Sequence, residues 1–205
     1  MTIHGQKSYN GVAFLSRVEP TDIQRGFRDP DMSLDARLVA ATFGNLRIIN
    51  TYCPNGTALG TDKFAYKLAW AARLETHARS LLGLEEPLVL AGDYNVIPEP
   101  IDAKSPESWA DDALFQPEAR ASYRRLINLG LTDALRACVP GPGAYTFWDY
   151  QAGAWQKNNG IRIDHLLLSP QAADLLAESG IDREPRAKEK ASDHTPVWCR
   201  LEKAK

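Results

Sequence analysis

Leu88-Val89-Leu90-Ala91-Gly92-Asp93-Tyr94-Asn95 joins a wholly apolar run to a polar tail. The apolar part is short and lies between Pro87 and Gly92, which predicts a strand covered on both faces rather than a surface element. Asp93 and Asn95 follow directly after this strand. Because side chains alternate along a strand, we expect these two polar groups to point the same way at the edge of a sheet.

Hydrophobic periodicity and turn residues predict the other elements. We expect strands at 10–17, 36–43, 46–52, 145–148, 163–169 and 196–201, and helices at 64–82, 117–129 and 170–179. Gly44-Asn45 fits the two-residue turn of an antiparallel hairpin, and residues 98–112 are the most irregular stretch. Strands and helices mix without strict alternation, which favours two packed sheets flanked by helices over a doubly wound parallel sheet.

Length and composition indicate one domain, residues 1–205, with 44% hydrophobic and 24% charged residues. The sequence contains no apolar run long enough for a membrane span and no secretory signal, so we expect neither membrane insertion nor export. Cys53, Cys138 and Cys199 are odd in number and far apart, which fits a reduced cytoplasm better than a disulfide framework or a thiol zinc site. The net charge of -2 restricts any contact with nucleic acid to a local patch.

Two short segments carry groups suited to phosphate chemistry. The Asp93 carboxylate could orient or deprotonate a water, while the Asn95 amide could donate to a phosphoryl oxygen. In Ser192-Asp193-His194, just before the last strand, Asp193 could bind a hard cation and His194 a scissile phosphate. The structural alternative is the same for both segments: these residues are also the common residues of turns.

Four further residues are weaker candidates when each is taken alone. Asp164 begins a strand, and its structural alternative is an ion pair with Arg162. Tyr52 closes a strand at what we expect to be the same sheet edge, so its hydroxyl could reach the phosphate, or it could be a half-buried strand residue. Phe147 and Trp148 could stack on a base or an abasic sugar, but aromatic side chains more often belong to the core.

Taken in order, these segments resemble the exonuclease III and apurinic/apyrimidinic (AP) endonuclease family, within the endonuclease/exonuclease/phosphatase superfamily. The resemblance is carried by His4-Gly5-Gln6-Lys7-Ser8-Tyr9-Asn10-Gly11-Val12-Ala13, Asn50-Thr51-Tyr52-Cys53-Pro54-Asn55-Gly56, Gly92-Asp93-Tyr94-Asn95, Tyr145-Thr146-Phe147-Trp148-Asp149-Tyr150, Arg162-Ile163-Asp164 and Ser192-Asp193-His194. These motifs span nearly the whole chain. The resemblance implies a four-layered α/β sandwich, with two packed mixed β-sheets flanked by helices, and a metal-assisted attack of water on a DNA phosphodiester.

The resemblance also implies residue roles. Asp93 would activate the water, Asn95 would hold the phosphate, and His194 would contact the scissile phosphate. The implied catalytic residues are Tyr52, Asp93, Asn95, Asp164 and His194; the metal ligands are Asp93, Asn95 and Asp193; the DNA contacts are Asn55, Phe147, Trp148 and His194. Asp193 would act as a metal ligand or as the carboxylate that orients His194. Mg²⁺ is the implied cofactor, with Mn²⁺ as an alternative.

This sequence departs from the family pattern at its start. Family members begin with a strand that carries a Trp-Asn pair, then a helix and a second strand ending in Gln-Glu-Thr, whose glutamate is the principal Mg²⁺ ligand. Neither segment is present, so the resemblance implies an N-terminally truncated member. It further implies a monomeric DNA-repair phosphodiesterase of the bacterial cytosol or nucleoid, with exonuclease and AP endonuclease activity on double-stranded DNA with abasic sites or 3′ ends. Two alternatives stay open: an impaired fragment that only binds DNA, and a phosphatase of a lipid or small-molecule phosphoester.

Overall fold

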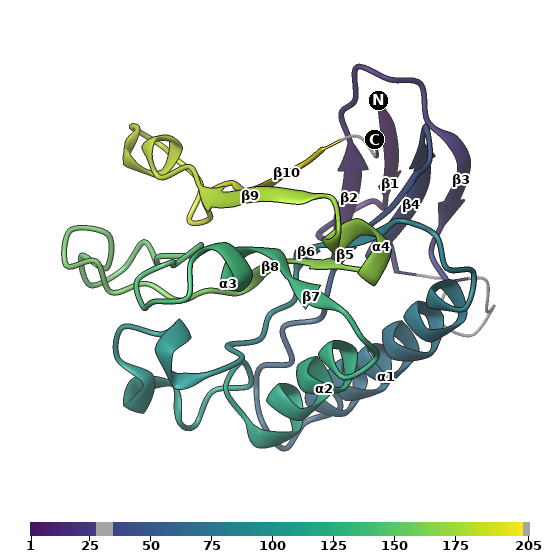
Figure 1. Ribbon diagram of the computed structural model, residues 1–205. Helices are drawn as coiled ribbons and strands as arrows, with labels where there is room; N and C mark the ends of the chain where they lie inside the picture. The colour runs from purple at the N-terminus through teal and green to yellow at the C-terminus, as the bar shows by residue number, and fades with distance from the viewer. Residues whose placement is uncertain (28–34, 203–205) are drawn as a thin grey trace.

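The computed structural model describes residues 1–27 and 35–202. Among these residues, six strands form one mixed sheet in the order β3-β4-β5-β6-β8-β7 (Figure 1). The strands are β3 (Thr21–Arg25), β4 (Leu38–Phe43), β5 (Leu46–Tyr52), β6 (Leu88–Asp93), β8 (Asp164–Leu168) and β7 (Thr132–Asp133). β5 and β6 are parallel, and their neighbours in the sheet pair antiparallel. The Gly44-Asn45 hairpin turn is confirmed, since Phe43 pairs with Leu46.

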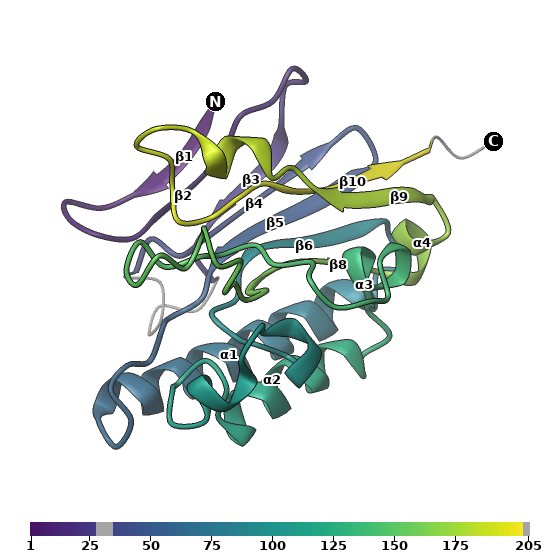
Figure 2. The same ribbon diagram turned by 90° about the vertical axis from the view of Figure 1, so that its left-hand side faces the viewer.

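Two long helices cover one face of this sheet, α1 (Asp62–Leu82) and α2 (Pro117–Ile127) (Figures 1 and 2). The helix predicted at 64–82 is confirmed, and its buried face carries Trp70, Leu74 and Ala78. They pack with Leu90 of β6 in the larger core cluster. The two helices therefore pack against one face of the sheet and do not cover the ends of its strands (Figure 1).

A second layer lies on the opposite face of the sheet. The antiparallel pair of β9 (Leu176–Ile181) and β10 (Val197–Leu201) packs there together with α3 (Ala134–Cys138) and α4 (Pro170–Ala173) (Figures 1 and 2). β1 (Thr2–Gly5) and β2 (Gly11–Phe14) form another antiparallel pair, which Asn50 attaches to the sheet by donating to the Ala13 carbonyl oxygen at 3.0 Å. β6 is therefore covered on both faces as predicted, and the expected α/β fold of mixed sheets flanked by helices is confirmed.

Two predicted elements are wrong. The helix expected at 170–179 ends at Ala173, because residues 176–181 pair with β10 and this tertiary pairing overrides local helix propensity. The strand expected at 145–148 is absent from the described residues, where Phe147 forms only isolated bridges with Ile161 and His194. The irregular stretch near residues 98–112 contains two short 3₁₀ helices, η2 (Pro100–Asp102) and η3 (Pro106–Trp109), and a third, η4 (Glu184–Ala187), precedes β10.

Gly92 allows β6 to approach β5 closely. Its φ is +136°, and a Cβ at this position would lie 1.9 Å from the carbonyl oxygen of Thr51. Only glycine fits so close a backbone contact. None of the helices in the described part of the chain is both long and apolar enough to cross a membrane.

Candidate active site

The register of the sheet places three of the predicted site residues in one row. Tyr52 at the end of β5 pairs with Asp93 at the end of β6, and Asp93 pairs with Asp164 at the start of β8. The loops around residues 98–116, 139–163 and 182–196 extend from one end of the molecule, at left in Figure 1. Polar groups from segments far apart in the sequence therefore converge at one sheet edge.

Asp93 and Asn95 meet through a tight turn. Asp93 Oδ1 accepts the backbone N–H of Asn95 at 2.8 Å, and Asn95 Nδ2 donates to Asp93 Oδ2 at 2.9 Å. The expected proximity is confirmed but its expected cause is wrong: β6 ends at Asp93, and Asn95 has a left-handed φ of 49°. Asn95 Nδ2 also donates to the Cys53 carbonyl oxygen at 2.9 Å, so both of its N–H groups are engaged within the protein.

Asn55 lies beside this turn. Its Nδ2 donates to Asn95 Oδ1 at 3.1 Å, and its Oδ1 accepts the backbone N–H of Thr57 at 3.1 Å. Asn55 is exposed, and an amide nitrogen carries two hydrogens. One N–H of Asn55 therefore fixes Asn95, while the other can donate to a bound group.

Lys67 contacts the backbone of both asparagines and was not among the predicted site residues. Its Nζ donates to the backbone carbonyl oxygens of Asn55 at 2.9 Å and Asn95 at 2.5 Å. Burial lowers the pKa of Lys67 to about 8. A signal was present in the sequence, because Lys67 continues the buried face of Trp70, Leu74 and Ala78, where a lysine is out of place.

His194 forms an ion-paired hydrogen bond with Asp164, whose Oδ2 lies 2.8 Å from His194 Nδ1. Burial opposes the charged imidazole, but the hydrogen bond to Asp164 and the charges of Asp164, Asp93 and Asp193 outweigh it and raise the pKa of His194 to about 9. His194 is therefore cationic at neutral pH. The ring of Phe147 stands edge-on to the imidazole, with centroids 5.1 Å apart.

Asp193 precedes His194 but does not hydrogen-bond its ring. Its carboxylate accepts from Ser192 Oγ at 3.4 Å, and its backbone carbonyl accepts the N–H of Trp148 at 2.9 Å. The carboxylate that orients His194 is that of Asp164. Of the two roles expected for Asp193, only metal binding is left as a hypothesis.

Two other predicted aromatic residues, Tyr52 and Trp148, differ in how far they are buried. The Tyr52 ring is half-buried, with the guanidinium of Arg37 4.9 Å from its centre. Trp148 is 0% exposed; its Nε1 donates to Asn158 Oδ1 at 3.2 Å, and its ring packs on Trp155. Trp148 is therefore a core residue, and the predicted contact of its side chain with DNA is wrong because the side chain has no exposed surface.

A divalent cation is compatible with the oxygen donors at this edge. Burial, followed by the charge of Asp164, raises the pKa of Asp93 to about 7. A cation beside this carboxylate would favour its charged form. No cluster of three or more His, Cys, Asp or Glu side chains suited to a metal occurs within residues 1–27 and 35–202. Mg²⁺ requires fewer protein ligands than that, because it keeps several waters and is held by one or two carboxylates together with substrate phosphates. The oxygen donors are therefore compatible with a divalent cation that completes its coordination shell with water and substrate.

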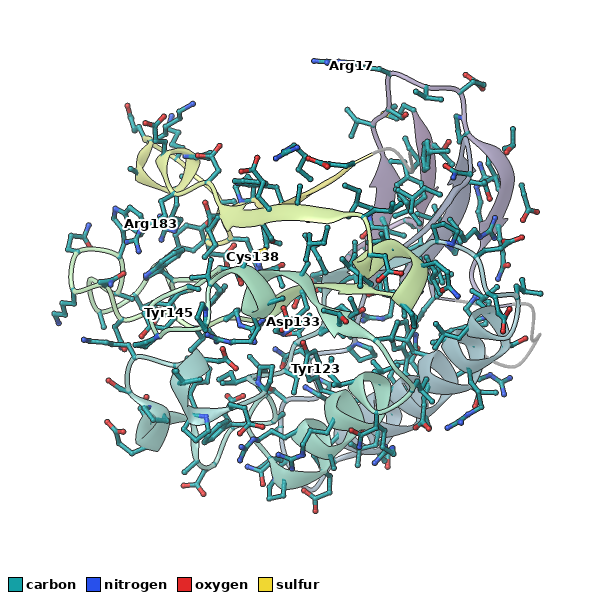
Figure 3. All side chains as sticks on the ribbon, viewed as in Figure 1. Arg17, Tyr123, Asp133, Cys138, Tyr145 and Arg183 are labelled. Atoms are coloured by element: carbon teal, nitrogen blue, oxygen red, sulfur yellow. The ribbon has the colours of Figure 1, made fainter. Side chains whose placement is uncertain are left out.

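A buried polar network supports the start of β8. Arg162 donates to Asp102 Oδ1 at 2.7 Å and to Asp133 Oδ2 at 2.6 Å, so the expected alternative, an ion pair between Arg162 and Asp164, does not form. Tyr123 Oη also donates to Asp133 Oδ2 at 2.8 Å, and the two residues lie together in Figure 3. Asp164 is thus left to pair with His194.

The fold is of the α/β class, with mixed sheets flanked by helices, and its site combines carboxylates, amides and an Asp-His pair. Such groups are suited to the hydrolysis of phosphoesters. The chain belongs to the endonuclease/exonuclease/phosphatase family, whose model matches residues 2–194. The family expected from the motifs is confirmed.

Two of the similar proteins are nucleases by name. Exodeoxyribonuclease III of Haemophilus influenzae is 34% identical, over 96% of this chain and 78% of its own length. The DNA repair nuclease APEX1 of Danio rerio is 33% identical, over 94% of this chain and 60% of its own length. This chain is an enzyme of the exodeoxyribonuclease III and AP endonuclease type.

Solved structures agree with this assignment. The 3′ phosphatase NExo from Neisseria, solved with a product DNA hairpin, is 40% identical with a TM-score of 0.93, over 97% of this chain and 77% of that one. The AP endonuclease from Archaeoglobus fulgidus is 35% identical with a TM-score of 0.93, over 98% of this chain and 78% of that one.

Proposed function

We propose that this chain is a Mg²⁺-dependent DNA-repair phosphodiesterase that cleaves double-stranded DNA at abasic sites and removes nucleotides from 3′ ends. The observation that carries the proposal is the single row of Tyr52, Asp93 and Asp164, extended by Asn95 on one side and His194 on the other. The names of the relatives, exodeoxyribonuclease III and AP endonuclease, support the same substrate.

The roles of the residues follow from their contacts. Asp93 is a carboxylate with a raised pKa, so it is a better proton acceptor than an ordinary aspartate and can take a proton from the attacking water. Asn95 holds both oxygens of Asp93 and thereby fixes the direction of that proton transfer. The second N–H of Asn55 can donate to a phosphoryl oxygen.

His194 stabilises charge on the phosphate. Asp164 occupies Nδ1, so Nε2–H of the cationic imidazole is left to face the substrate. A charged donor fixed in place before the reaction lowers the barrier most when the oxygen it faces gains charge in the transition state. Phe147 stands beside the imidazole and is the side chain we propose to contact the sugar or base next to the scissile bond.

Asp93, Asn95 and Asp193 are the residues that would hold Mg²⁺. The ion would supply Lewis-acid polarisation of a phosphoryl oxygen and bring the substrate phosphate to an acidic site. We also propose that the chain acts as a single-domain monomer in the cytoplasm, in keeping with its three free cysteines.

Single-turnover cleavage of a labelled abasic duplex by the 205-residue chain tests the proposal. We expect nicking with Mg²⁺, none in EDTA, and a loss of at least about 100-fold in Asp93→Asn, because the variant cannot accept the proton. Cleavage that survives both EDTA and the substitution would contradict the proposal.

Two further substrates separate the alternatives. A duplex with a recessed 3′ end, and the same duplex with a 3′ phosphate, compare exonuclease with phosphatase activity. Turnover of a small phosphoester with inert DNA would favour a small-molecule phosphatase. Binding of the abasic duplex without any cleavage would identify a DNA-binding protein.

A further inference from the structure

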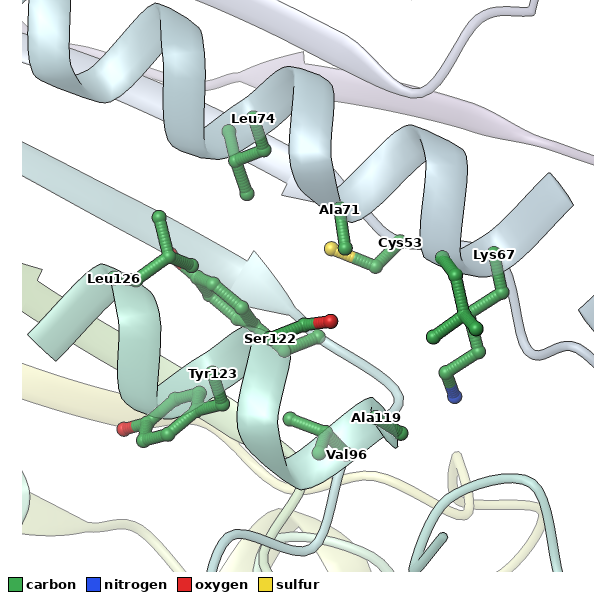
Figure 4. A pocket seen from close by; sticks show the side chains of 11 residues that line it. Cys53, Lys67, Ala71, Leu74, Val96, Ala119, Ser122, Tyr123 and Leu126 are labelled. Atoms are coloured by element: carbon green, nitrogen blue, oxygen red, sulfur yellow. The ribbon is translucent and has the colours of Figure 1, made fainter. Parts of the chain in front are cut away.

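Lys67 is an unusual residue for its place in the fold. It lies on the buried face of α1, directly above Trp70 in the helix, and is only 4% exposed. Figure 4 shows its side chain beside Cys53 at the wall of a cavity of about 30 Å³ between α1 and α2. Burying an ammonium group costs free energy unless every donor finds a good acceptor. A lysine in such a place therefore requires a reason beyond the packing of the helix.

The partners of Lys67 supply that reason. Its Nζ donates to the carbonyl oxygens of Asn55, in the loop after β5, and of Asn95, in the loop after β6. The same two loops are joined directly by the side chains of Asn55 and Asn95, at 3.1 Å. One ammonium group thus holds the backbone of the two residues whose amides organise the site.

The loop after β5 is shaped around the lysine stem. Gly56 is buried with a φ of +86°, and a Cβ there would lie 2.6 Å from Lys67 Cδ. On the other side, Asn95 holds a left-handed φ of 49°, a conformation that costs a non-glycine residue free energy and needs fixed partners. The two loops and the lysine therefore fit one another as a unit.

We propose that Lys67 is a positioning residue of this site. It touches no substrate itself. It holds Asn55 and Asn95 by their carbonyl oxygens, and Asn95 in turn holds both carboxylate oxygens of Asp93. The catalytic part of this inference rests on the proposed function, whereas the structural part concerns the two loops alone.

Lys67→Met tests the structural part by amide hydrogen exchange. Methionine keeps an unbranched apolar stem but cannot donate, so both carbonyl oxygens lose a partner. We expect faster exchange in peptides that contain Cys53, Asn95 and Thr57, whose N–H groups donate to acceptors within these loops. Leu74→Ala is the matched control, because it removes a buried side chain from the same face of α1 and leaves both hydrogen bonds of Lys67 Nζ in place.

The catalytic part is tested by steady-state cleavage of the abasic duplex. We expect kcat of Lys67→Met to fall roughly 10- to 100-fold with little change in KM, since misplacement of an organising group by about 1 Å has effects of that size. Leu74→Ala should keep kcat per folded molecule. Lys67→Arg, which retains donors, should keep more loop protection and more activity than Lys67→Met; it also takes the place of Lys67→Met if that variant fails to fold.

The two parts fail in different ways. Loop protection in Lys67→Met equal to that in Leu74→Ala would overturn the positioning role. Suppose that the loops exchange faster in Lys67→Met than in Leu74→Ala, but that the unmodified chain does not cleave the abasic duplex. This result would support the positioning of the loops by Lys67 and contradict the proposed function. Loosened loops with an unchanged kcat would overturn the catalytic part of the inference.

Discussion

His194 and Asp93 both bind a proton more tightly than such residues usually do, for related reasons. Burial is the largest cause of the raised pKa of Asp93, and repulsion from Asp164 adds to it. Asp164 also stabilises the cationic imidazole of His194 by a hydrogen bond and by its charge, against the effect of burial. Asp164 thereby contributes to both properties that the proposed function uses, the charged donor at His194 and the stronger base at Asp93. This division of roles is what general acid-base chemistry at neutral pH requires.

Asp164→Asn should lower the pKa of His194 from about 9 toward its ordinary value of 6.5. The substitution removes the charge and weakens the hydrogen bond that favour the imidazolium. The pKa can be measured by following the imidazole nitrogens of His194 in an NMR titration. Asp193→Asn is the control and should cause a smaller change, because Asp193 contributes charge but does not bind the ring. Equal changes in the two variants would contradict the assignment of Asp164 as the orienting residue.

The parallel pair β5-β6 sets the geometry of the site, since its two strands end side by side and release their loops at the same edge. Its close spacing depends on Gly92, where the backbone of Thr51 leaves no room for a Cβ. The loops that carry Asn55 and Asn95 follow these strands at once. Any change in the separation of β5 and β6 should therefore be transmitted to both asparagines.

Gly92→Ala should destabilise the protein by roughly 3 kcal/mol or more, because the new methyl group would clash with the Thr51 carbonyl and the φ of +136° disfavours alanine. Urea unfolding monitored by circular dichroism measures the change. Gly83→Ala is the control: its φ is -66° and the nearest atom to an added Cβ is 3.5 Å away, so stability should change by less than about 1 kcal/mol. A similar decrease in the free energy of unfolding in both variants would contradict the expectation that the close approach of β5 and β6 requires glycine at position 92.

Elements with strong periodicity or a clear turn were predictable, whereas elements made by distant pairing were not. β5, β6 and α1 have apolar runs or a helical stripe and were located nearly to the residue. β9 has the local sequence of a helix and becomes a strand only because β10 lies beside it. β1 and β3 are short and largely polar, so they carry little signal of their own.

The sequence predicted which acidic residues and which histidine meet at the sheet edge, but neither the lysine that supports them nor the burial of Trp148. The polar residues at the ends of strands or just before them, such as Asp93 and His194, could be found because strand ends meet at sheet edges. Lys67 was missed because its role depends on the loop backbones that fold over it, which no periodicity describes. The burial of Trp148 likewise depends on Trp155 and on the loop at 158, which are brought together only by the tertiary fold.

At the scale of the whole molecule, Arg162 connects elements that are distant in sequence. It donates to Asp102 at the end of η2 and to Asp133 on β7. It also lies 3.0 Å from Nδ1 of His165 on β8. Because an arginine can only donate, His165 Nδ1 must accept, and its Nε2–H donates to the Val96 carbonyl oxygen at 3.2 Å. His165 is therefore neutral in the folded protein.

This neutral histidine makes stability depend on pH. Burial, followed by the charge of Arg162, lowers the pKa of His165 from 6.5 to about 4. A base whose pKa is lower in the folded state contributes its stability above the unfolded value, so the free energy of unfolding should fall as pH decreases from 6.5 to 4, by roughly 3 kcal/mol from this residue. Urea unfolding across this range measures the slope, and His165→Gln should flatten it. An unchanged slope in the variant would assign the acid sensitivity to other groups.

The order of the site residues along the chain has a consequence for protein synthesis. Tyr52, Asp93 and Asp164 leave the ribosome before His194, which pairs with Asp164 across thirty positions of sequence. The hydrogen bond between Asp164 and His194 therefore forms only after the segment that carries His194 has been synthesised, whereas the strands β5 and β6 that pair beside it are made much earlier. A chain released before residue 194 lacks the cationic donor that we propose for phosphate binding, so it should not cleave DNA.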